Sequence, residues 1–415
     1  MARKLCSITA LLLILCLVLA GCNEDPIHTA DTSPTNSTSG IGNTSGSAGT
    51  LAYADWRWAY NQNGAFSEYG YYYLKNGFLY FLDTGNGTSV CLCSKVGCLH
   101  DKEPDPFIQE LCEARIYGLK TPVFYWNDHL YYIELDGYGP QLYRRNADGT
   151  AEAQIVTLGI PYLEEQKQIE VWNHAVADGY LYYEGCVESL IIEGDSAMEA
   201  RDRYFIGRVN LKTGKDEVVL EGNQGEVVNL CAIRPNGVLF FSYPLPDMDP
   251  QEPEYQEALQ QVPTTLKYWN GETEETIIVF EKTRQECVRI NMVENGKVYY
   301  SGTGVVTNWV YDLTDGSDLL LTEDTLRYIN GNYAFLHDGS GWNLWNIQTK
   351  EVYQIELTSP LVAAEATSED GFILAWKIQE NGKIVRRIYC YATYASIQDG
   401  LQEEDMMQFY TLEMA

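Results

Sequence analysis

Residues 178–183 read DGYLYY, and residues 295–300 read NGKVYY. Each stretch begins with an Asx-Gly pair, which tolerates a positive φ at both central positions of a tight β-turn. The aliphatic and aromatic residues that follow suit a buried strand of a sheet. The two stretches therefore predict the same β-hairpin at two distant places in the chain.

The hairpin pattern recurs in seven copies, some of them degraded. The copies begin at residues 76, 127, 178, 236, 295, 330 and 370. A second turn follows most copies, as in NLKTGK at residues 210–215 and DLTDG at residues 312–316. One unit therefore contains four antiparallel strands, joined by two tight turns and a crossing loop. Units of this kind, repeated around a ring, form the blades of a β-propeller.

The repeats predict an all-β fold in which residues 51–415 form a β-propeller of seven blades. Six or eight blades stay open as alternatives, because the first unit is short. The last unit, residues 361–397, lacks an outer strand after Tyr391, and we expect residues 51–60 to supply it and close the ring. The chain contains one candidate for a short helix, at residues 255–261 within an acidic loop.

The N-terminus contains the parts of a bacterial secretion signal. It begins with Arg3 and Lys4, continues with an apolar run too short to cross a bilayer, and reaches LAGC at residues 19–22. This end resembles the lipobox, which lipoprotein signal peptidase cuts before a diacylated cysteine. By the resemblance, residues 1–21 are a signal peptide and Cys22 carries the lipid. The alternative is an ordinary signal peptide or a weak anchor.

Residues 22–50 consist largely of Ser, Thr, Gly and Asn and have no apolar period. Such a segment predicts a flexible tether with a reach of roughly 25 Å. The formal net charge of the chain is −30. A body this acidic is repelled by nucleic acid and by anionic lipid head groups, so we expect no nucleic-acid partner. Attachment to the bilayer is therefore expected through the Cys22 lipid, at the extracytoplasmic face of the cell membrane.

Beyond the lipobox and the tether, three stretches carry a further resemblance. They are LYYIELDG at residues 130–137, LYRRNADGT at residues 142–150 and CLCSKVGCLHD at residues 91–101. Together they resemble the cell-surface lipoproteins of gut Firmicutes, whose propellers are related to those of the low-density lipoprotein receptor-related proteins. The resemblance implies the fold and the location, and it implies no reaction.

Four cysteines and a histidine gather after the first repeat. Cys93, Cys98, His100 and Cys112 have the residue types and short spacing of a closed, structural zinc site, with Cys91 as a spare ligand. Disulfides among Cys91, Cys93, Cys98 and Cys112 are the alternative, because disulfides persist outside the cytoplasm. A third alternative is that these cysteines are unpaired thiols. Zinc or a disulfide would make the segment a structural clasp, and none of the three implies catalysis.

The other cysteines of the repeat region occur singly in strand-like contexts, which is typical of small buried apolar residues. They are Cys186, Cys231, Cys287 and Cys390. Tryptophans outside the repeat positions are candidates for exposed binding residues. They are Trp56, Trp58, Trp126, Trp172, Trp309 and Trp342. The repeat tyrosines are expected to pack one blade against the next.

No motif in the sequence indicates an active site. It contains no Gly-x-Ser-x-Gly nucleophile elbow and no phosphate-binding glycine loop. The sequence therefore favours a tethered binding or scaffold module for a protein, peptide or glycan. The alternative is an extracellular polysaccharide hydrolase or lyase on a propeller, whose carboxylate pair cannot be recognised from spacing.

The lipid anchor is tested by replacing its cysteine. Cys22→Ala is expected to move the protein from the membrane fraction to the soluble fraction, or to leave the signal peptide uncleaved. Cys16→Ala, inside the apolar run, should leave fractionation unchanged. Mass spectrometry of the mature wild-type N-terminus checks the site directly. A free thiol at residue 22, with cleavage elsewhere, would contradict the prediction.

Overall fold

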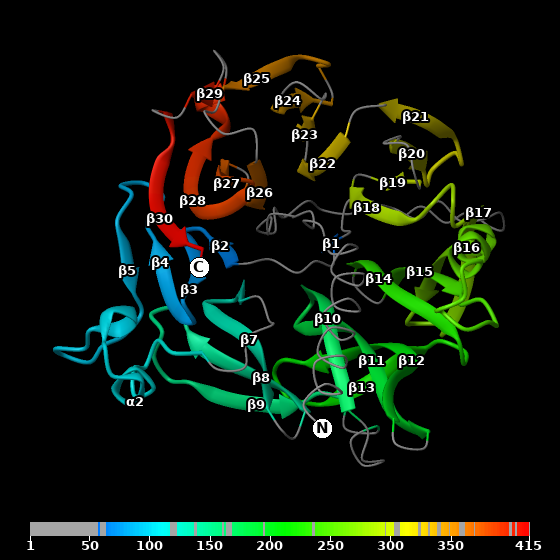
Figure 1. The fold of residues 1–415 in the computed structure, drawn as a ribbon, viewed down its shortest axis with the longest axis horizontal. Helices are drawn as coiled ribbons and strands as arrows, with labels where there is room; N and C mark the ends of the chain where they lie inside the picture. Colours follow the sequence, from blue (N-terminus) through cyan, green and yellow to red (C-terminus); the bar gives the residue numbers. More distant parts are fainter. Residues whose placement is uncertain are drawn as a thin grey trace.

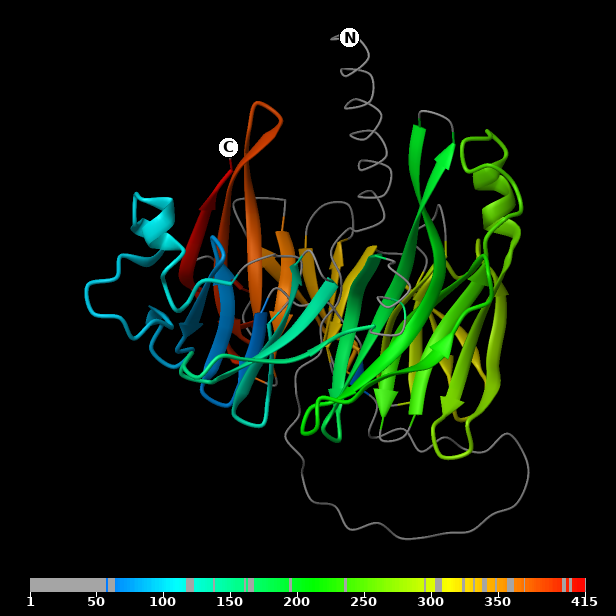
Figure 2. The same ribbon diagram turned by 90° about the horizontal axis from the view of Figure 1, so that it is seen from below.

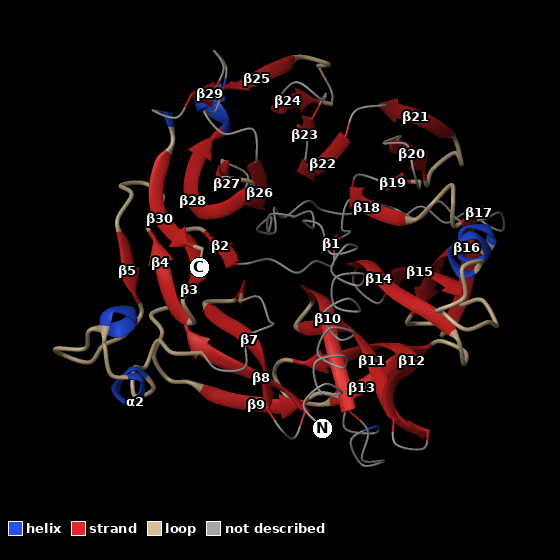
Figure 3. Ribbon diagram, viewed as in Figure 1, coloured by secondary structure: helices blue, strands red, loops and turns tan. Residues whose placement is uncertain are grey.

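The computed structural model describes most of the repeat region as strands arranged radially around a central axis (Figure 1). The described residues are 57–58 and 64–414, apart from 117–122, 137–138, 160–161, 163–167, 194–195, 235–236, 295, 303–307, 323–324, 331–332, 338–341, 348, 357–361, 369, 398–400 and 403–404. Strand accounts for nearly all of the regular structure in this part of the chain (Figure 3).

The first three blades each contain four consecutive antiparallel strands. Blade 1 comprises β2 (Gly64–Ser67), β3 (Gly70–Lys75), β4 (Phe78–Leu82) and β5 (Ser89–Cys91). Blade 2 comprises β6 (Phe124–Trp126), β7 (His129–Asp136), β8 (Gly139–Asn146) and β9 (Ala153–Thr157). Blade 3 comprises β10 (Gln168–Ala177), β11 (Tyr180–Glu193), β12 (Ser196–Asn210) and β13 (Asp216–Glu221).

The remaining four blades continue the same order around the ring. Blade 4 comprises β14 (Glu226–Arg234), β15 (Gly237–Pro244), β16 (Pro263–Asn270) and β17 (Glu275–Thr283). Blade 5 comprises β18 (Arg289–Glu294), β19 (Lys297–Ser301), β20 (Asn308–Asp312) and β21 (Asp318–Thr322). Blade 6 comprises β22 (Thr325–Asn330), β23 (Tyr333–His337), β24 (Trp342–Asn346) and β25 (Val352–Glu356). Blade 7 comprises β26 (Val362–Thr367), β27 (Gly371–Glu380), β28 (Lys383–Thr393) and β30 (Met407–Glu413).

The prediction of an all-β propeller with seven blades is therefore confirmed. Two short strands join blades as fifth members: β1 (Arg57–Trp58) in blade 4 and β29 (Leu401–Gln402) in blade 6. In the described part of the chain, the helical segments are η1 (His100–Lys102), α2 (Pro106–Gln109), α4 (Tyr255–Gln261) and η2 (Tyr394–Ile397). The short helix predicted at residues 255–261 is thus present as α4.

The predicted closure of the ring is wrong. Residues 51–60 were expected to supply the outer strand of blade 7, but β30 pairs with β28 there. Residues 57–58 instead form β1, which pairs with the inner edge of β14 near the centre of the ring (Figure 1). The reason is that the chain returns after η2 to β28, whose outer edge would otherwise lack a partner.

The Asx-Gly turns have the backbone that the sequence predicted. Asp178 and Gly179 have φ values of 50° and 79°, and Gly296 has a φ of 74°. Asn76 and Gly77 also have positive φ, but their turn joins the second and third strands of blade 1. The first copy is therefore shifted by one strand relative to the pattern, because residues 71–73 (YYY) occupy the second-strand position that the repeat fills elsewhere.

The repeat aromatics form the contacts between neighbouring blades. Tyr131 of blade 2, for example, lies in one apolar cluster with Tyr183 and Phe205 of blade 3. Tyr132, Tyr182, Tyr183 and Tyr300 are among the largest side chains that are fully buried. This confirms that the repeat tyrosines belong to the core.

Several buried tyrosine hydroxyls bond a carboxylate near the start of the outer strand. The Tyr183 hydroxyl donates to Asp216 at 2.8 Å, and the Tyr300 hydroxyl donates to Asp318 at 2.8 Å. Tyr132 donates to Glu152 in the same way. Burial raises the pKa of Tyr183 well above its usual value, so this hydroxyl keeps its proton and remains a donor.

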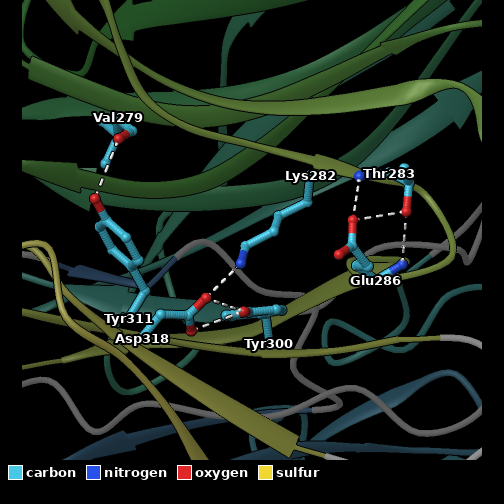
Figure 4. A network of polar contacts seen from close by, with 7 residues as sticks. All are labelled: Val279, Lys282, Thr283, Glu286, Tyr300, Tyr311 and Asp318. Carbon is cyan, nitrogen blue, oxygen red and sulfur yellow. Dashed lines mark hydrogen bonds and ion pairs between the residues drawn. The ribbon is translucent and has the colours of Figure 1, made fainter.

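A polar network joins the outer edges of blades 4 and 5 (Figure 4). Lys282 of β17 forms an ion pair with Asp318, the same carboxylate that accepts from Tyr300. The Tyr311 hydroxyl donates to the Val279 carbonyl at 3.4 Å. The network therefore couples the two blades.

Among the described residues, the long insertions lie on one face of the ring (Figure 2). The β11–β12 hairpin (green), the β27–β28 hairpin (orange), α4 and the segment around α2 (cyan) rise on this side. We call it the insertion face. In blades 2–7, the turn between the first and second strands lies at the opposite face, where each connection is short.

The turn geometry predicts a large cost for a β-branched residue at Gly179. Its φ of +79° is strained for L side chains, although a Cβ atom there would meet nothing closer than 3.6 Å. Gly179→Val is expected to lower the free energy of unfolding by about 1–3 kcal/mol, from backbone strain alone. Gly179→Asn is the control, because asparagine tolerates positive φ, and it should lose less. Chemical denaturation that gives equal stabilities for Val, Asn and Gly would contradict the assignment.

Candidate functional site

The outer strand of blade 1 is interrupted. β5 pairs with one half of β4, opposite residues 80–82. Residues 114–116 pair with the other half: the Leu79 amide donates to the Ala114 carbonyl at 2.8 Å, and the Ile116 amide donates to the Gly77 carbonyl at 2.9 Å. Between these two pieces the chain leaves the blade and returns. We call residues 92–113 the excursion, and its two adjacent ends the neck.

The zinc candidates of the sequence meet at the neck. Cys93 lies one residue past the start of the excursion, and Cys112 lies one residue before its end. Cys98 and His100 fold back from the loop between them. The four ligand atoms lie within 4.8 Å of one another, and the His100 Nδ1 atom is 3.5 Å from the Cys112 sulfur. Cys91 lies outside this group, and Cys22 lies outside the residues that the structure describes.

The sulfur atoms of the group have unequal surroundings. Burial disfavours the Cys93 thiolate, but hydrogen bonds from the backbone amides of Lys95 and Glu113 outweigh it, and the pKa of Cys93 is lowered. Burial raises the pKa of Cys112, the most buried of the four ligands. Burial also raises the pKa of Cys91 to about 12. Cys91, Cys93, Cys98 and Cys112 are separate thiols in the structure, with no disulfide among them.

Two charged residues hold the excursion to the propeller. Asp101 accepts a hydrogen bond from the Tyr80 hydroxyl at 2.6 Å and lies 3.0 Å from the Lys75 ammonium group. Arg145, buried on β8 of blade 2, donates to the backbone carbonyls of Glu113 and Arg115. The neck is thus tied both to its own blade and to the next one.

The outer part of the excursion exposes apolar side chains. Asp105 caps the short helix α2 by accepting from the Phe107 amide, but neither α2 nor η1 has a buried residue. Phe107 is 80% exposed and Val96 is fully exposed. The exposed large apolar residues of the excursion are Val96, Leu99, Phe107, Ile108 and Leu111. We call these five residues the apolar surface.

The sequence did not predict the apolar surface. The run DPFIQEL at residues 105–111 contains apolar residues without the alternation of a strand, between acidic residues and prolines. This lack of a period was the feature of the sequence that could have indicated an exposed loop. No feature of the sequence indicated that the outer strand is interrupted, because pairing of residues 114–116 with β4 depends on the tertiary path of the chain.

The tryptophan candidates do not form an exposed set. Trp126, Trp172, Trp309 and Trp342 are half-buried and pack against apolar clusters of the core. Trp56 lies outside the described residues, and Trp58 is described only through the backbone pairing of β1. The single cysteines Cys186, Cys231, Cys287 and Cys390 are buried, as predicted. In the part of the chain that the structure describes, no helix is long and apolar enough to cross a membrane.

Comparison with known proteins supports the fold. No family model and no curated protein matches the chain. A puromycin-hydrolysing peptidase from Mycobacterium tuberculosis is similar in structure, with a TM-score of 0.53 and 10% identity, over 86% of this chain. This chain spans 56% of the length of that peptidase. At such low sequence identity the structural similarity supports the propeller fold of this chain and says nothing about its activity.

Two further solved structures are similar at lower scores. The β-propeller domain of the Trilobed protease from Pyrococcus furiosus has a TM-score of 0.46 and 8% identity, over 85% of this chain and 98% of that one. An oligogalacturonate lyase from Vibrio parahaemolyticus has a TM-score of 0.45 and 9% identity, over 65% of this chain and 73% of that one.

The link between the neck and blade 2 predicts the effect of losing Arg145. Arg145→Met keeps the length of the side chain but leaves the carbonyls of Glu113 and Arg115 without a charged donor. The free energy of unfolding is expected to fall by about 2–4 kcal/mol. Arg208→Met removes a more exposed ion pair with Glu217 and should cost about 1 kcal/mol or less. Urea denaturation that ranks Arg208→Met as the more damaging change would contradict the link.

Proposed function

We propose that this protein is a lipid-tethered, extracytoplasmic binding or scaffold module that docks a partner protein through the apolar surface of the excursion. The observation that carries the proposal is that five large apolar side chains on one loop of the insertion face are exposed. Exposed apolar patches on a soluble body mark interaction sites more often than chance exposure does.

The distribution of exposed apolar residues supports this choice of surface. Elsewhere in the described part of the chain, pairs such as Ile277 with Ile278 and Leu319 with Leu320 lie on the outer edge strands β17 and β21. Edge strands of a propeller commonly carry such residues singly or in pairs. The apolar surface differs because it lies on a loop that the blade does not need for its own pairing.

The chemistry of the surface favours a protein partner. Its residues are aliphatic, with one phenyl ring, so they offer few of the hydrogen bonds that a glycan requires. The net charge of −30 opposes insertion among anionic lipid head groups. It also favours a partner that presents a neutral or basic rim around its apolar contact.

The proposed anchor explains how such a module would be held in place. A lipid on Cys22 and the tether of residues 22–50 would keep the propeller within roughly 25 Å of the membrane surface. The long insertions would then be free to meet a partner at the cell surface, because the tether imposes no single orientation on the body.

The docking surface is tested with a photo-crosslinking amino acid at position 107, in cells that produce the full chain. We expect irradiation to give a discrete adduct of higher mass. The same amino acid at position 278 is the control, because Ile278 is 65% exposed but lies on β17. A variant with Val96, Ile108 and Leu111 changed to serine should lose the adduct at position 107 while keeping the wild-type melting temperature.

Two results would overturn the proposal. Adducts of equal yield at positions 107 and 278 would show that contact is nonspecific. An adduct of twice the chain mass, formed also by the purified protein, would assign the surface to a second copy of this chain instead of a separate partner.

A further inference from the structure

The neck of the excursion is poorly stabilised by contacts of the protein chain alone. Two segments far apart in sequence, β5 and residues 114–116, must lie end to end along β4 to complete one outer strand. The excursion between them has no apolar core of its own, since its helical segments bury no residue and the large apolar side chains of residues 94–111 face solvent. Ordering a loop of this length without burial is unfavourable.

Four side chains converge where the two segments meet. Cys93 and Cys112 come from the two ends of the excursion, while Cys98 and His100 come from the arm that folds back on them. Three thiols and one imidazole are the ligand types of closed, four-coordinate zinc sites. Tetrahedral ligands at zinc bond lengths lie about 3.8 Å apart, so the present separations need to shorten by about 1 Å at most.

The groups that hydrogen-bond to the four ligands and their neighbours also fit a metal site. The backbone amides of Lys95 and Glu113 point at the Cys93 sulfur, and amide donors of this kind stabilise a metal-bound thiolate. Glu113 in turn accepts from the Ser94 amide and hydroxyl, so the residues next to two ligands hold each other across the neck.

We infer that Cys93, Cys98, His100 and Cys112 bind one zinc ion, which closes the neck and joins the two halves of the outer strand of blade 1. The ion would also fix the excursion that carries the apolar surface, but the zinc site is independent of the proposed partner. A site with four protein ligands leaves no open position for water, so its role is structural.

The geometry favours zinc over a disulfide. The group contains three cysteines, so a disulfide between two of them would leave the third thiol and the imidazole without a role in closing the neck. The His100 Nδ1 atom, 3.5 Å from the Cys112 sulfur, completes a metal site but adds nothing to a disulfide. Cys91, which would make the cysteines even in number, lies outside the group.

Metal content tests the ligand set on the full chain, purified without chelators. Elemental analysis is expected to find about one equivalent of zinc per chain, as four ligands for one ion require. Substitution with Co²⁺ should give the visible absorption of a tetrahedral thiolate site. Cys98→Ser is expected to weaken zinc binding by at least about 10- to 100-fold, because losing even a residue that only hydrogen-bonds to a ligand costs that much. Cys91→Ser is the matched control and should keep the full equivalent.

Hydrogen exchange tests what the ion does. Removing zinc with a chelator should speed exchange at the Leu79 and Ile116 amides, whose bonds join residues 114–116 to β4. The Leu313 amide, which donates to the Gly296 carbonyl in blade 5, is the control and should be unaffected.

Each result decides the inference. Zinc-free protein in which peptide mapping finds a disulfide between two of Cys93, Cys98 and Cys112 would replace the metal by a covalent clasp. An unchanged zinc affinity in Cys98→Ser would overturn the ligand set. Unchanged exchange at Leu79 and Ile116 after zinc removal would overturn the role in joining the strand.

Discussion

The architecture depends on satisfying the hydroxyl groups of tyrosines that the repeat places in the core. An aromatic doublet after each turn gives neighbouring blades a large buried contact, but a buried hydroxyl without an acceptor would be costly. In blades 2, 3 and 5 the acceptor is a carboxylate at or next to the start of the outer strand, bonded by Tyr132, Tyr183 and Tyr300. The same bond fixes where the fourth strand begins, so core packing and strand register are set together.

In blade 1 the corresponding hydroxyl, that of Tyr73, lies 2.6 Å from the Ser89 hydroxyl at the start of β5, so a serine replaces the carboxylate. A second tyrosine, Tyr80 on β4, donates to Asp101, which belongs to the excursion. The excursion is therefore attached to its blade through the third strand. Because it leaves at the insertion face, its length does not disturb the tight turns of the opposite face. In a ring of this kind, connections of variable length are tolerated on the insertion face, whereas the Asx-Gly turns fix the length of the connections that they form.

Most residues of the candidate site could be predicted from the sequence, but their position at the neck of the excursion could not. The residue types and spacing of Cys93, Cys98 and His100 identified three members of the cluster, and Cys112 was a reasonable fourth because a long loop can return. Spacing could not separate Cys91 from the others. Cys91 is the last residue of β5, opposite Tyr80, and is held there by strand pairing. The exposure of Phe107 and its neighbours was likewise undetermined, because an apolar run predicts burial until the tertiary structure shows that nothing covers it.

The sequence by itself determined the elements that rest on local rules. The Asx-Gly turns, the buried aromatic doublets and the radial repeat of four-stranded units follow from backbone preference and from a period that repeats along the chain. Only the tertiary structure decided how the ring closes: β30 completes blade 7, and β1 lies against the inner edge of β14. It also decided that residues 114–116 complete the strand begun by β5. These pairings join segments distant in sequence, and their choice depends on which strand edges remain unpaired after the blades have packed, which no local pattern records.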